Sequence, residues 1–78
     1  MDYKEEALEI FRKFVIKYNG WSENEYTLNY TVEKIKKDTF NTQWFAPKES
    51  AIFCVNKILE TTNKREYYVD VLNEIKSF

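Results

Sequence analysis

The residues best suited to binding chemistry lie between positions 34 and 48, where lysines alternate with large aromatic side chains. Four lysines outweigh Asp38 here, so residues 34–48 carry a net charge of +3 between two acidic ends of the chain. Such a mixture can stack nucleic-acid bases over a phosphate-attracting surface, or anchor a protein interface within a charged rim. It also fits a structural role, with the aromatic residues in the core and the lysines solvated. The members of this basic-aromatic segment are Lys34, Lys36, Lys37, Phe40, Trp44, Phe45 and Lys48.

Catalytic and metal-binding chemistry finds little support in the residue types. The chain has no histidine, which is a common general base and zinc ligand. Its single cysteine, Cys54, can form neither a thiolate metal site nor a disulfide within the chain. Carboxylate pairs such as Glu5 and Glu9 are ordinary on a solvated helix face. We therefore expect no enzymatic activity, no metal and no cofactor.

Length and composition indicate a single small globular domain over residues 1–78. A hydrophobic content of 44% and an aromatic content of 18% are too high for a disordered chain. The net charge of −1 argues against general polyanion binding. The N-terminus lacks the basic region of a signal peptide, and no apolar run is long enough to span a membrane. We therefore expect a cytoplasmic protein that does not bind membranes.

Three helices are predicted by apolar residues that recur at three- and four-residue spacing and so share one helix face. Asp2 with Glu5 has the spacing of a capping box at the first helix, and Asn63 with Glu66 has it at the third. Gly20 supplies a left-handed exit from the first helix. The three predicted helices span residues 2–18, 47–62 and 64–77.

Some large side chains need attention because of where they lie on these helices. Tyr18 belongs to the apolar face of the first helix, so we expect it to be buried. Ile16 lies nearly opposite that face, and we interpret it as an ordinary exposed residue. Phe53 points about 160° away from the apolar face of its helix. It is either covered by the middle of the chain or exposed for a partner.

Residues 22–38 fit either a strand or a helix. In the strand, tyrosines and aliphatic residues alternate with polar ones from position 26 to 33. In the helix, Ser22 and Glu25 form a capping box, acidic residues lead and lysines trail. Tyr26 and Tyr30 then point outward, opposite a face made of Trp21, Leu28, Val32 and Ile35.

The helix is favoured because the only glycine already ends the first helix, whereas tight hairpin turns usually need one. The fold class we expect is therefore mainly α. The alternative is an α+β fold, in which residues 25–45 form a β-hairpin packed on three helices. The expected small bundle has about four helices, at residues 2–18, 22–38, 47–62 and 64–77.

These features favour a small stand-alone protein-binding module, an inhibitor or adaptor of the anti-defence or host-takeover type. A lysine- and asparagine-rich composition is typical of AT-rich genomes, which suggests a phage or mobile element as the source. The alternative is a small nucleic-acid-binding regulator that uses segment 34–48, and a homodimer is compatible with either function. The predicted partner-binding residues are Lys34, Lys36, Lys37, Phe40, Trp44, Phe45, Tyr26, Tyr30 and Phe53.

Overall fold

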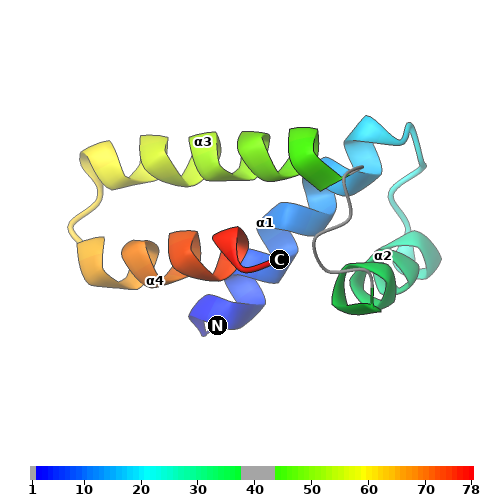
Figure 1. Ribbon diagram of the computed structural model, residues 1–78, viewed down its shortest axis with the longest axis horizontal. Coiled ribbons are helices and arrows are strands. Elements are labelled where there is room, and N and C mark those ends of the chain that lie inside the picture. The colour runs from blue at the N-terminus through cyan, green and yellow to red at the C-terminus, as the bar shows by residue number, and fades with distance from the viewer. Residues whose placement is uncertain (1, 38–43) are drawn as a thin grey trace.

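The chain folds into a small bundle of helices, as Figure 1 shows for the computed structural model, which describes residues 2–37 and 44–78. The predicted mainly α fold is confirmed. The alternative hairpin is wrong for residues 25–37, which are helical, and part of its remainder falls outside the described residues. The helices are α1 (Tyr3–Tyr18), α2 (Glu25–Lys37), α3 (Phe45–Thr61) and α4 (Arg65–Lys76).

Helix α1 begins and ends with the signals that its sequence carries. A carboxylate oxygen of Asp2 accepts a hydrogen bond from the backbone N–H of Glu5 at 2.9 Å. At the other end, Gly20 adopts a left-handed conformation with φ of 68°. The backbone N–H groups of Gly20 and Trp21 donate to the carbonyls of Lys17 and Ile16, respectively. This Schellman motif satisfies carbonyls that the helix end would otherwise leave unpaired.

Helix α2 starts at Glu25, because Asn24 caps it instead of Ser22, two residues after the predicted cap. The Asn24 side-chain oxygen accepts from the backbone N–H of Thr27, and the Thr27 hydroxyl oxygen accepts from the backbone N–H of Asn24, each at 3.0 Å. These two bonds form a reciprocal box at the spacing expected for a helix start. The Thr27 hydroxyl also donates to the Ser22 carbonyl at 2.6 Å, which fixes the chain just before the helix.

Two other helix starts differ from the sequence-based prediction. Helix α3 begins at Phe45, so Pro47 is buried within its first turn instead of opening it. Helix α4 begins at Arg65 and has no side-chain cap, so the predicted box of Asn63 and Glu66 does not form. The hydroxyl of Thr62 instead accepts from the backbone N–H of Lys64 at 3.0 Å. Hydrogen bonding within the short turn replaces the expected cap.

Helix α1 is the central element of the bundle. Helices α3 and α4 run side by side and both pack on α1, while α2 packs on α1 at one end of the molecule (Figure 1). Because α1 contacts three helices, more than one of its faces is covered, and Ile16 is buried, contrary to the prediction. The buried cluster consists of Ala7, Phe11, Val15, Ile35, Trp44, Ala51, Val55, Val71 and Ile75.

Polar contacts at the periphery join α1 to α4 and α3 to Phe78. The hydroxyls of Tyr67 and Tyr68 in α4 both donate to the carboxylate of Glu6 in α1. The ammonium of Lys48 in α3 donates to the backbone carbonyl of Phe78, and partial burial lowers the pKa of Lys48. This hydrogen bond therefore holds Phe78 against α3.

Candidate interaction surfaces

An exposed aromatic cluster lies on the outer face of α2 and consists of Trp21, Tyr26 and Tyr30. The rings of Tyr26 and Tyr30 are stacked, with centroids 6.3 Å apart and an interplanar angle of 11°. Trp21 lies edge-on against Tyr30, with centroids 5.8 Å apart. Tyr26 is the most exposed of the three, at 76%. The predicted outward orientation of both tyrosines is confirmed because α2 is a helix, with Thr31 and Ile35 on its buried face.

Lys34 continues this surface toward the end of the helix, whereas Lys36 lines a separate hollow with residues of α1 and α4. The Lys34 ammonium lies 6.0 Å from the centroid of the Tyr30 ring, within the range of a cation–π contact. Lys36 and Lys37 follow in the last helical turn and are exposed, whereas Glu25 occupies the first turn. The structure therefore places Tyr26, Tyr30 and Lys34 together, as one part of the predicted site.

Trp21 is a member of this cluster that the sequence pattern did not indicate. Its spacing from Leu28 placed it on the buried face of the helix. The helix begins only at Glu25, so helical spacing does not apply to Trp21, which is 37% exposed. Trp21 belongs to the connection between α1 and α2, so the conformation of that connection determines its position.

The other predicted site residues that the structure describes are not all on the surface. Trp44 is 3% exposed and belongs to the core, so it has the structural role and is not available as a contact residue. Phe45, its neighbour, is 60% exposed at the start of α3. Phe40 lies outside the described residues. The described residues of segment 34–48 are thus divided between a surface helix, the core and the exposed side of α3.

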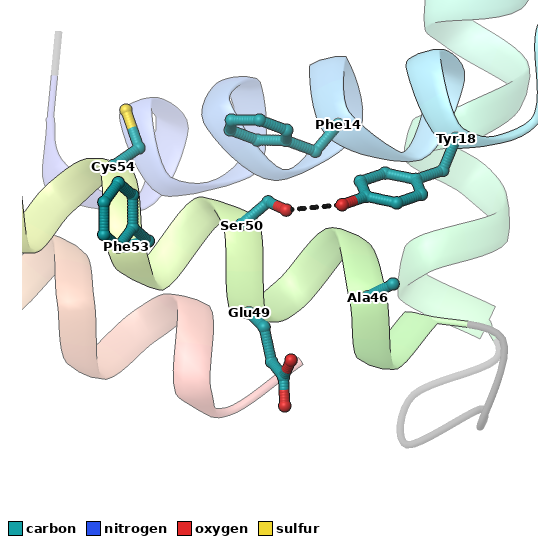
Figure 2. Close-up of a pocket in the computed structure, with 7 residues that line it drawn as sticks. All are labelled: Phe14, Tyr18, Ala46, Glu49, Ser50, Phe53 and Cys54. Carbon is teal, nitrogen blue, oxygen red and sulfur yellow. Dashed lines mark hydrogen bonds between the residues drawn. The ribbon is translucent and has the colours of Figure 1, made fainter.

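A shallow groove runs between α1 and α3, and we call it the α1–α3 groove. Figure 2 shows Phe14 and Tyr18 of α1 on one side, with Ser50, Phe53 and Cys54 of α3 on the other. The Tyr18 hydroxyl lies 2.8 Å from the Ser50 hydroxyl and links the two walls. The groove encloses about 480 Å³. Its lining residues are Phe14, Tyr18, Ala46, Glu49, Ser50, Phe53 and Cys54.

Phe53 forms the exposed edge of the α1–α3 groove. Its side chain is 63% exposed, so the described part of the chain leaves it uncovered. The Lys57 ammonium lies 5.4 Å from the centroid of its ring and also pairs with Glu60 at 3.8 Å. Phe53 therefore presents an aromatic ring beside a cation at the edge of an apolar groove.

The sequence pattern did not predict the other wall of this groove. Tyr18 was expected in the core, yet it is exposed. The hydrogen bonds that join α1 to α4 are made near the start of α1, at Glu6. The last turn of α1 extends beyond that contact, where Ser50 of α3 engages the tyrosine hydroxyl.

The described residues of neither surface form a cluster of metal-ligating side chains. Among residues 2–37 and 44–78, no group of three or more His, Cys, Asp or Glu side chains could hold a metal ion. The tyrosine with the largest pKa change is Tyr67, which lines neither surface. What both surfaces offer is exposed aromatic area beside charged groups, which suits binding.

Comparison of the chain with protein-family models, with curated proteins and with solved structures finds no match. Within the part of the chain that the structure describes, no helix combines the length and apolar character needed to cross a bilayer.

Proposed function

We propose that this chain is a small protein-binding module, an inhibitor or adaptor whose α1–α3 groove receives a partner protein. The observation that carries this proposal is Phe53, which is 63% exposed at the edge of the groove. A domain of this size buries only about 60–65% of its unfolded surface, so a large aromatic residue left outside adds little to a thin margin of stability. An exposed phenylalanine beside an apolar groove is therefore best explained by a partner that covers it.

The groove combines apolar side chains with hydrogen-bonding groups, as the centre of a protein interface does. Phe14, Cys54 and Phe53 supply apolar surface, while the Tyr18 and Ser50 hydroxyls supply a hydrogen-bonding pair. Aromatic anchors in such settings provide much of the binding free energy, and a charged rim steers the encounter. Lys57 beside Phe53 belongs to such a rim. The arrangement suits an apolar side chain of the partner inserted between α1 and α3.

The composition supports a particular form of this function. Lysine and asparagine are frequent, as in proteins from AT-rich phage and mobile-element genomes. We therefore propose a host protein as the target, in an anti-defence or host-takeover role.

Affinity capture from host-cell lysate tests this proposal. The bait proteins are the wild type, Phe53→Ala and, as a matched control, Tyr26→Ala, which removes a ring that is also largely exposed, from α2. The proposal predicts that a protein recovered with the wild type is lost with Phe53→Ala and retained with Tyr26→Ala. Recovery of the same proteins by all three baits would exclude the groove as the binding site.

Nucleic-acid binding by α2 is a second candidate function, favoured by the contact of Lys34 with Tyr30 next to Lys36 and Lys37. Stacking tyrosines beside lysines suit single strands. Titration with single-stranded and duplex DNA at two salt concentrations tests it, because binding through lysines must weaken steeply as salt rises. Absence of binding at low salt would eliminate this function.

A further inference from the structure

A second hollow adjoins the α1–α3 groove and differs from it in carrying a cation. Its lining consists of Phe14, Lys17 and Tyr18 of α1 with Ser50 of α3, and it encloses about 370 Å³. Phe14, Tyr18 and Ser50 also line the groove, so the two hollows meet where the Tyr18 and Ser50 hydroxyls are linked. We call the second hollow the Lys17 end of the groove.

The charge at this end comes from Lys17. Its ammonium is exposed and has neither a hydrogen bond nor an ion pair within residues 2–37 and 44–78, whereas Lys13, one turn earlier, pairs with Glu9. Glu49 is the acidic residue among those that line the groove in the described part of the chain. Figure 2 shows its carboxylate pointing away from the linked hydroxyls, so it does not neutralise the Lys17 end.

The groups at the Lys17 end are mainly hydrogen-bond donors. The Tyr18 and Ser50 hydroxyls lie 2.8 Å apart, and either of them can be the donor. One hydroxyl hydrogen is used in this bond, so the hydrogen of the other hydroxyl can be donated to a further acceptor. The Lys17 ammonium adds three donors and no acceptor. An acceptor with one negative charge matches this set, and in a protein partner that group is the carboxylate of Asp or Glu.

We propose that the partner segment received by the α1–α3 groove carries a carboxylate close to its apolar anchor. This inference rests on the proposed function, because it names the chemistry of the segment that enters the same groove. The anchor contacts Phe14 and Phe53, and the carboxylate pairs with Lys17. Lys17 follows Phe14 by three positions on α1, a spacing that places two side chains about 5–6 Å apart. The anchor and the acid of the partner therefore lie within about one helical turn of each other.

A phosphate group fits the Lys17 end less well than a carboxylate. Sites for phosphorylated partners usually gather several arginine or lysine side chains. Among the described residues that line the groove and its Lys17 end, Lys17 is the only basic one. The neighbouring walls of Phe14 and Phe53 also suit an apolar side chain, which a protein segment supplies next to its acid.

Selection from a random peptide library displayed on yeast tests this inference before the partner is known. The wild type should enrich peptides that carry Asp or Glu within about four positions of an aromatic or large aliphatic residue. Lys17→Glu reverses the charge and should enrich Lys or Arg there instead. Lys64→Glu is the matched control, because it makes the same charge change at an exposed site just before α4. It should select the same peptides as the wild type.

Affinities of one enriched peptide separate the carboxylate contact from an effect on folding. Replacing the acidic residue of the peptide by its amide counterpart should weaken binding to the wild type about threefold. The same replacement should change nothing in Lys17→Met, which keeps the apolar stem but has no charge to pair.

Two sets of results would contradict these expectations, and they differ in what they overturn. Peptides that need Phe53 but carry no acid, or an equal loss in the wild type and Lys17→Met, would overturn this inference and leave the groove as a binding site. A wild type that enriches no peptide, or peptides that Phe53→Ala binds equally well, would overturn the proposed function together with it.

Discussion

Asn24 and Thr27 hydrogen-bond each other in both directions at the start of α2, with each bond 3.0 Å long. This pair determines where the helix begins, and so which of its residues point outward. The Asn24→Ala variant should lose about 0.5–2 kcal/mol of unfolding free energy, as other N-cap removals do. Ser22→Ala should change little, because Ser22 contributes only its backbone carbonyl. Urea unfolding of both variants checks this, and equal losses would contradict the assignment.

Trp44 and Phe45 are sequence neighbours with opposite surroundings. Trp44 is buried in the core, whereas Phe45 is exposed. We predict that Trp44→Ala lowers the unfolding free energy by about 3–5 kcal/mol, since it removes a large buried side chain and leaves a cavity. Phe45→Ala should stay within about 0.5 kcal/mol of the wild type. Denaturant unfolding measures both values, and a larger loss for Phe45→Ala would refute the placement.

Gly20 ends α1 with φ of 68°, and a Cβ added there would meet nothing within 4 Å. The cost of Gly20→Ala should therefore come from the backbone alone, about 1–2 kcal/mol of unfolding free energy. Gly20→Asn should cost less, because asparagine tolerates the left-handed region better than alanine. Thermal or urea unfolding of the two variants gives the ranking. Equal unfolding free energies for the two variants would contradict a left-handed conformation at Gly20.

Tyr67 has a pKa raised to about 12, first because its hydroxyl donates to Glu6, and then because of burial and the negative charge of Glu6. The folded pKa lies above the ordinary value of 10.0. The contact therefore stabilises the fold fully below about pH 10 and loses that effect as pH rises toward 12. Ultraviolet titration of tyrosinate should show a late step near pH 12 that disappears in Tyr67→Phe. Identical titration curves would contradict this contact.

The sequence was sufficient to predict the helical fold and the outward direction of Tyr26 and Tyr30. Both predictions rest on local periodicity, which a helix expresses directly. Helical periodicity could not predict that Trp21 is exposed and Trp44 is buried. Both residues lie just outside the helices, where burial depends on tertiary packing. Trp21 instead lies beside Tyr30, outside α2.

The α1–α3 groove shows the same limit. Tyr18 continues the apolar face of α1, so spacing alone places it in the core. It lines a groove instead, where its hydroxyl lies 2.8 Å from the Ser50 hydroxyl of α3. Phe53 was recognisable from the sequence as lying off the apolar face, but its position beside a groove depends on the packing of α1 against α3.

The dissociation constant of the captured partner for wild type, Phe53→Ala and Tyr26→Ala tests the central claim most directly. Isothermal titration calorimetry with purified proteins provides it. If Phe53 anchors the interface, Phe53→Ala should bind at least about tenfold more weakly, a loss of about 1.4 kcal/mol or more. Tyr26→Ala should bind like the wild type. Equal constants for all three proteins, or a loss confined to Tyr26→Ala, would contradict binding in the α1–α3 groove.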